Sequence, residues 1–142
     1  MIHEDQDNYK EAVIKYDQSL RIKRELGDKS GIAGTLHHLG MIHQDQGSYE
    51  ESIKKFKESL GIAKKIGDIR IIASNMGQLG KIYVEKKDYS SALQSFFTAF
   101  SIFKKLNSPY AQLVASDLVI LRNMMGEEEF NAQLERLVNN NV

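Results

Sequence analysis

Apolar residues recur along this chain at spacings of three and four residues, with lysine and glutamate between them. The pattern is clearest in two segments: Tyr9, Val13, Tyr16 and Leu20, and then Tyr49, Ile53, Phe56 and Leu60. This period places the apolar residues on one face of a helix. No segment alternates apolar and polar residues as a half-buried strand does. The sequence therefore predicts an all-α fold.

A shift of 40 residues brings the chain into register with itself. Residues 7–46 and 47–86 share 13 identical positions, among them the Gly-Asp pairs at 27–28 and 67–68 and the Leu-Gly pairs at 39–40 and 79–80. A third copy follows, with Tyr89, Ala92 and Phe96 at the matching positions, and then diverges. Self-similarity at a fixed period of about 20–50 residues is typical of repeat proteins, whose repeats bury their apolar faces against one another.

Each copy divides into two helices at residues that favour helix ends. Gly27 and Gly67 suit the left-handed conformation that closes a helix, and Asp28 and Asp68 can cap the next one. The third copy achieves the same with other residues: Asn107 for the left-handed turn, Ser108 as the cap and Pro109 at the first helical position.

The second helix of each copy is predicted to begin at Asn8, Ser48 or Asp88. Glu11 and Glu51 follow the first two by three residues, which predicts a capping box at each.

Gly40 and Gly80 lie inside predicted first helices, where glycine costs about 1 kcal/mol relative to alanine. A glycine repeated at that cost indicates two helices that cross too closely for a side chain.

We therefore expect one all-α domain over residues 1–142, an α-solenoid of stacked antiparallel helix pairs with a C-terminal capping helix. Its parts are a partial repeat at 1–27, repeats at 28–67 and 68–107, a divergent helix at 108–125 and a capping helix at 127–139. Residues 1–6 match residues 41–46 at five of six positions. The chain is thus expected to begin inside a first helix, as a fragment of a longer array would.

Composition and charge exclude several classes of protein. Nineteen Lys and Arg balance nineteen Asp and Glu, whereas a nucleic-acid-binding protein normally carries a basic excess. The chain has no cysteine, so disulfides and thiolate metal sites are excluded. Neither a signal peptide nor an apolar stretch of about 18 residues is present. We expect a cytoplasmic protein without a membrane or nucleic-acid partner.

Candidate chemistry is sparse. The chain contains no Gly-rich phosphate loop, nucleophile elbow or HExxH motif, and its carboxylates fall on predicted exposed helix faces. His37 and His38 point about 100° apart on a helix, and His38 and His43 lack the i, i+4 spacing of a helical metal site. We therefore expect no catalysis, no cofactor and no metal.

The matched positions of the two central copies carry a family pattern. They are Leu39, Gly40, His43, Gly47, Tyr49, Ser52, Phe56, Ser59 and Leu60, followed by Leu79, Gly80, Tyr83, Tyr89, Ala92, Phe96 and Ala99. The pattern resembles the tetratricopeptide repeat family, in particular its longer-repeat group that includes kinesin light chain and spindle-adaptor proteins. Ser52 and Ser59 replace the family's preferred alanine. Val119 and Ile120 take the Leu-Gly positions of the last copy, so that helix is expected to pack differently.

The resemblance implies a protein–protein interaction scaffold whose first helices line a concave groove for a peptide or helix of a partner. The groove positions, carried over one by one, are His37, His38, Met41, Gln44, Asp45, Ser74, Gln78, Lys81, Val84, Glu85, Leu121 and Met125, with Gly77, Asp117 and Met124 beside them.

A second hypothesis is self-assembly, for example as a homodimer. Because the first repeat is incomplete, the face formed by Val13, Tyr16 and Leu20 is expected to be partly uncovered, and an uncovered apolar face favours association. The two hypotheses assign the binding residues to opposite parts of the molecule.

Overall fold

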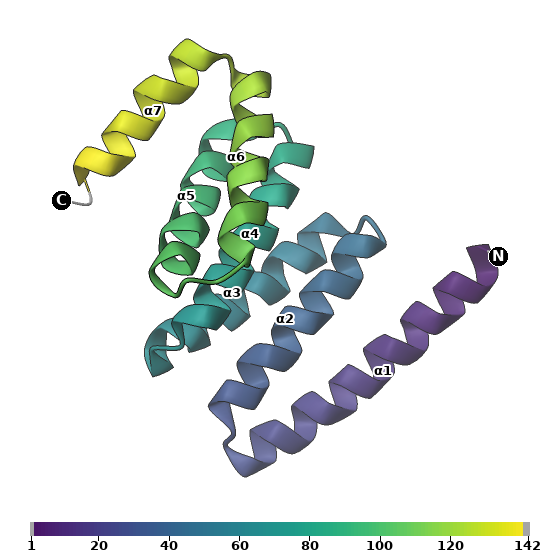
Figure 1. Cartoon of the computed structure of the whole chain (residues 1–142). Coiled ribbons are helices and arrows are strands. Elements are labelled where there is room, and N and C mark those ends of the chain that lie inside the picture. Colours follow the sequence, from purple (N-terminus) through teal and green to yellow (C-terminus); the bar gives the residue numbers. More distant parts are fainter. Residues whose placement is uncertain (1, 141–142) are drawn as a thin grey trace. The chain divides into compact units, whose positions relative to one another are not determined.

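The computed structural model describes the backbone of residues 2–140 and the side chains of residues 8–140. Within this part of the chain the regular structure is helical (Figure 1). The helices are α1 (Ile2–Leu26), α2 (Lys29–Asp45), α3 (Tyr49–Ile66), α4 (Ile69–Glu85), α5 (Tyr89–Lys105), α6 (Tyr110–Met125) and α7 (Glu127–Asn140). The all-α solenoid fold predicted from the repeat is confirmed.

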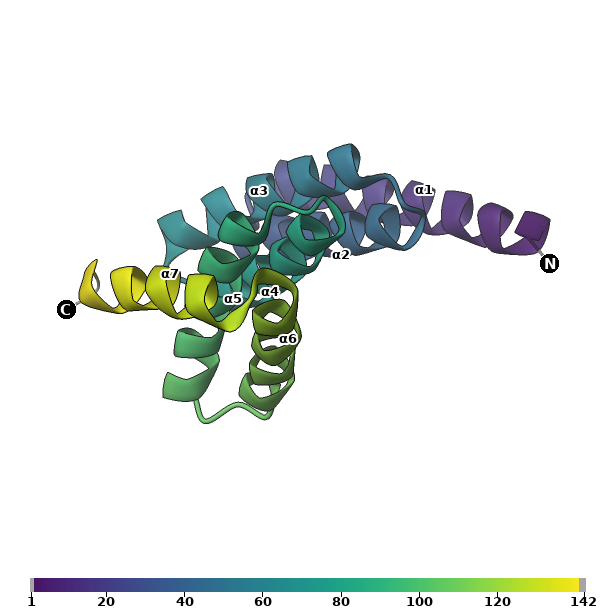
Figure 2. The ribbon, with the colours of Figure 1, turned by 90° about the horizontal axis from the view of Figure 1, so that it is seen from above.

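The helices form two compact units, and the boundary between them falls inside α4, between Asn75 and Met76. In the first unit, α1 and α3 both pack against α2. In the second unit, α5 packs against α6, and the chain turns at Gly126 so that α7 contacts both helices and leads away from the end of α6 (Figures 1 and 2).

The predicted helix ends are mostly confirmed. Gly27 and Gly67 adopt φ angles of 70° and 73°. The Asp28 Oδ1 atom accepts a hydrogen bond from the Gly31 backbone N–H at 2.9 Å, as an N-cap does. The caps at Asp68 and Asp88 accept the N–H groups of the residues three positions later at 3.2 Å.

The turn before α6 also matches its prediction. Asn107 has a φ of 53°, and the Ser108 hydroxyl accepts a hydrogen bond from the Tyr110 N–H at 3.2 Å. Pro109 has helical dihedral angles immediately before the helix begins. The helix α6 therefore starts where Asn107, Ser108 and Pro109 predicted that it would.

One predicted helix start is wrong, and so is one predicted capping box. A single helix, α1, runs through Asn8, so no second helix begins there. Asp7 continues the helix at the position where Gly47 and Lys87 of the next two copies adopt left-handed φ angles of 75° and 62°. Ser48 does precede α3, but its side chain makes no capping hydrogen bond, so the capping box predicted with Glu51 is not formed.

The close helix crossings predicted at Gly40 and Gly80 are present. A Cβ atom added to Gly40 would lie 2.7 Å from the Phe56 ring, and one added to Gly80 would lie 2.5 Å from the Phe96 ring. Both rings are fully buried or nearly so. Each phenylalanine ring therefore packs directly against the backbone of the facing glycine, and this contact holds α2 to α3 and α4 to α5.

The divergent helix α6 lacks this contact, as predicted. Val119 and Ile120 occupy the Leu-Gly positions, and their side chains are 47% and 52% exposed. The side chains of α6 that enter the core of the second unit are instead Val114 and Leu121.

Candidate functional site

The candidate surface in the first unit is a stripe along α2. His37, Met41 and Gln44 are spaced by four and three residues, so they share one helix face. Met41 is 36% exposed, and His37 and Gln44 are half-buried. Asp45 is exposed at the end of the stripe, and Ser74 on α4 is half-buried. The stripe combines one flexible apolar side chain with groups that donate and accept hydrogen bonds.

The position of His37 is fixed by contacts with two neighbouring helices. Its Nδ1 atom lies 2.8 Å from Oδ1 of Asn75 on α4, and its ring centroid lies 5.3 Å from that of Phe56 on α3. Asn75 is fully buried, so this hydrogen bond is shielded from water. His37 was predicted from the sequence as a site residue, but Asn75 was not. The two residues are 38 positions apart, and helical periodicity does not show which residues so distant in the chain are in contact.

Burial also changes the titration of His37. It lowers the pKa of the imidazole below its usual value, the hydrogen bond to Asn75 opposes this shift, and His38 adds to it. The net direction is downward, so at neutral pH the ring is uncharged.

A pH-dependent stability is expected from this shift. Unfolded His37 binds a proton below about pH 6.5, whereas folded His37 binds it only at lower pH. Between these two values the unfolded state holds more protons, so the free energy of unfolding falls as the pH falls, by at most about 1.4 kcal/mol per pH unit from this residue. Urea unfolding at pH 7.5 and 5.5 measures the loss. His37→Gln should lose less stability than the unchanged chain over this interval, and equal losses would contradict the assignment.

His38, next to His37 in the chain, contacts one of the residues proposed for self-association. Its ring stacks on that of Tyr16 in α1, with centroids 5.5 Å apart and planes 19° from parallel. For this pair, the expectation that the two sets of residues occupy opposite parts of the molecule is wrong. The cause is that α1, which carries Tyr16, packs against α2, which carries His38.

The α1 face proposed for self-association is partly covered by α2. Leu20 is 4% exposed and joins Leu36 and Leu39 in a core cluster, with Val13 and Tyr16 packed against it. Val13 and Tyr16 are only half-buried, so the face is partly uncovered as expected, and self-association through it stays a prediction.

In the second unit, Gln78, Lys81 and Glu85 follow one another on α4 at spacings of three and four residues, so they share a face. Lys81 and Glu85 are exposed, and Gln78 and Val84 are half-buried. Burial raises the pKa of the Asp117 carboxyl on α6. The positive charge of Lys81 opposes this shift but has the smaller effect.

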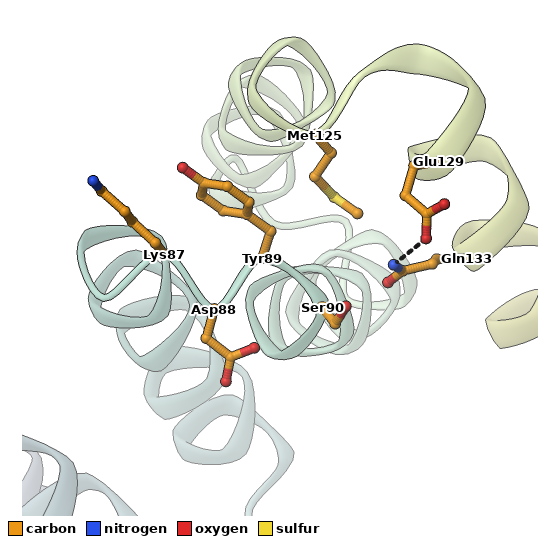
Figure 3. A pocket seen from close by; sticks show the side chains of 7 residues that line it. All are labelled: Lys87, Asp88, Tyr89, Ser90, Met125, Glu129 and Gln133. Carbon is orange, nitrogen blue, oxygen red and sulfur yellow. Dashed lines mark hydrogen bonds between the residues drawn. The ribbon is translucent and has the colours of Figure 1, made fainter.

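The remaining candidates on α6 have different surroundings. Leu121 has no exposed surface and belongs to the core of the second unit, so it is left out of the surface proposed below. Met125 is half-buried and borders a hollow of about 280 Å³ lined by the start of α5, the end of α6 and α7 (Figure 3).

That hollow is mainly polar. Tyr89 and Ser90 from the start of α5 line it together with Met125, and on α7 the Gln133 Nε2 atom donates a hydrogen bond to Glu129 Oε1 at 2.8 Å (Figure 3). It depends on the direction that α7 takes after Gly126, and no sequence pattern predicted that direction.

Two further observations concern chemistry and location. Among the residues that the structure describes, no group of three or more His, Cys, Asp or Glu side chains is arranged to hold a metal ion. None of the helices in the described part combines the length and the apolar character needed to cross a membrane.

Known proteins share the repeat and the fold. The family model for the tetratricopeptide repeat matches residues 1–64 and 31–105, and the model for anaphase-promoting complex subunit 5 matches residues 80–136. No curated protein matches the chain.

Among solved structures, the fold is similar to that of BtubC (BKLC) from P. vanneervenii, with a TM-score of 0.76 and 19% sequence identity. The match covers 92% of this chain and 55% of that one, so the chain spans about half the length of BtubC. The tetratricopeptide match covers most of the chain, with the helix pairs and glycine contacts described above, and the chain belongs to the tetratricopeptide repeat family.

Proposed function

We propose that this chain is a non-catalytic scaffold that binds a peptide or a helix of another protein. Tetratricopeptide repeats generally mediate protein–protein interaction. The observation that carries the proposal is the α2 stripe, in which a half-buried histidine of fixed orientation stands one turn from the part-exposed Met41. A pre-oriented polar group beside an adaptable apolar one suits recognition of an extended or helical segment, because little side-chain entropy is lost on binding.

The second unit offers its own surface, formed by Gln78, Lys81 and Glu85 on α4. The charged residues of this surface are exposed, so they contribute to orientation and to the rate of association more than to affinity. We propose that partners use both surfaces in the manner of the family, with α2 as the larger source of affinity.

Peptide selection tests the proposal. A displayed library of random peptides is selected against the whole chain, and calorimetry measures the affinity of the selected peptides. His37→Ala combined with Met41→Ala is expected to weaken binding at least tenfold, about 1.4 kcal/mol, because it removes both the fixed polar group and the apolar contact. Replacing His37, Gln78 and Lys81 together by alanine is expected to abolish binding.

The matched control changes two exposed residues of α3, Lys57→Ala and Lys64→Ala, and should leave affinity unchanged. Circular dichroism checks that every variant keeps its helices. Selected peptides that bind the α2 variant as tightly as the control would overturn the assignment of the binding surface.

A further inference from the structure

His37 is one member of a ring of hydrogen bonds that joins three helices of the first unit. The ring runs from the His37 Nδ1 atom to Asn75 Oδ1 at 2.8 Å, from Asn75 Nδ2 to Ser59 Oγ at 2.9 Å, and from Ser59 Oγ to the Ala33 carbonyl oxygen at 2.6 Å. In an α-helix that carbonyl also accepts the N–H of the residue four positions on, which is His37 itself. The ring therefore closes on the residue from which it starts.

The donor and acceptor of each bond follow from chemistry. The Ala33 carbonyl can only accept, so Ser59 donates its single hydroxyl proton to it. Ser59 must then accept from Asn75, which fixes the amide with Nδ2 toward Ser59 and Oδ1 toward His37. A carbonyl oxygen has no proton to give, so the proton of the last bond belongs to His37 Nδ1. In the neutral ring, Nε2 is consequently a bare acceptor.

This acceptor is open to solvent. His37 Nε2 has no hydrogen-bond partner in the structure, and among the described residues no side-chain nitrogen or oxygen is both buried and without a partner. Nε2 therefore keeps some surface that is accessible to solvent.

The next repeat shows that this ring of hydrogen bonds is not needed to build the fold. At the positions 40 residues on from His37, Ser59 and Asn75, the chain has Gly77, Ala99 and Ala115. A Cβ atom added to Gly77 would touch Ala99 Cβ at 4.0 Å, so small apolar residues fill that place. His37 and Ser59 lie in the repeat at 28–67 and Asn75 lies in the first helix of the repeat that follows. None of the three has its counterpart 40 residues on, which indicates that they act together.

We propose that His37 is a specificity-determining residue: Asn75 and Ser59 hold it as the Nδ1–H tautomer, and its Nε2 accepts a hydrogen bond from an N–H or O–H group of the bound peptide. A peptide carboxylate or carbonyl cannot bind there, because it would meet a lone pair. The contact with the peptide rests on the proposed function, whereas the tautomer is a property of the free chain.

NMR spectroscopy of the free, ¹⁵N-labelled chain at pH 7.5 tests the tautomer. Long-range ¹H–¹⁵N correlations of the imidazole should show a protonated Nδ1 and an unprotonated Nε2 for His37. In the Ser59→Ala, Asn75→Ala variant, which carries the residues of the next repeat, the same ring should become a mixture of both tautomers. A His37 ring protonated at Nε2, or a variant with an unchanged spectrum, would overturn the proposal.

The peptide contact is tested on a peptide selected against the whole chain. Replacing its backbone amides one by one with esters, and its hydroxyl side chains with hydrogen, should reveal one position where the change weakens binding about tenfold. In His37→Phe that position should lose its effect. An equal loss in both proteins, or no sensitive position, would overturn the contact. A chain that selects no peptide overturns the proposed function and the contact with it, while the tautomer is still decided by NMR.

Discussion

Replacing Phe56 with alanine is expected to lower the free energy of unfolding by about 3–5 kcal/mol. The side chain has no exposed surface, and its ring covers Gly40 and contacts His37. No small movement of α2 can fill the space left behind, because α2 is also packed against α1 through Leu36 and Leu39. The cost therefore includes both the lost burial of the ring and the remaining cavity.

Urea denaturation followed by circular dichroism measures this loss. The control is Ile22→Ala on α1, which removes a side chain that is 55% exposed and should cost no more than about 0.5 kcal/mol. A loss below about 1 kcal/mol for Phe56→Ala would show that the contact between α2 and α3 is looser than described. Because the ring also supports His37, the variant should weaken peptide binding even where it remains folded.

The features predicted correctly from the sequence are those encoded by neighbouring residues. The period of 40 residues, the left-handed turn at Gly27 and the cap at Asp28 are each local, and each is present. The contact at Gly40 could also be predicted, because a glycine that lowers helix stability in two successive repeats needs a structural reason.

Features that depend on distant residues could not be predicted. Ser59 was interpreted only as a small residue in a place where the family prefers alanine. In the structure its hydroxyl links Asn75 to the Ala33 carbonyl, across separations of 16 and 26 residues. Helical periodicity reports which face a residue occupies, but not which polar atoms meet when two faces pack. The same limit explains why the buried position of Leu121 was missed.

The errors at α1 and α3 have a local cause. Asn8 is a favourable cap residue, yet α1 runs through it as one helix, whereas Gly47 and Lys87, which precede the starts of α3 and α5, adopt left-handed φ angles of 75° and 62°. Conversely, α3 begins at Tyr49 although Ser48 forms no side-chain cap, because Gly47 with its φ of 75° has already turned the chain. At these turns, the residue that reverses the chain decides the helix boundary.

Gly80→Val is the second substitution with a large expected effect. The first atom of the new side chain would lie 2.5 and 2.6 Å from two carbons of the Phe96 ring, far inside van der Waals contact. Phe96 is 1% exposed and cannot swing into solvent without losing its burial. Overpacking of this kind costs about 1–3 kcal/mol and occasionally more, and the gain in helix propensity over glycine offsets only a few tenths of that. We expect a loss of about 3 kcal/mol, measured by urea denaturation.

The matched control is Gly61→Val, also inside a helix, where an added Cβ meets no atom within 4 Å. It should change stability by no more than about 0.5 kcal/mol, because only the helix propensity changes. Phe96→Leu provides the second test. In combination with Gly80→Val it should cost less than the sum of the two single changes by about 0.5–3 kcal/mol, since the smaller side chain makes room for the valine. Simple additivity would mean that Gly80 is retained for a reason other than the ring it faces. Coupling would show that glycine and phenylalanine form a single contact, and that each repeat carrying both holds its two helices together in the same way.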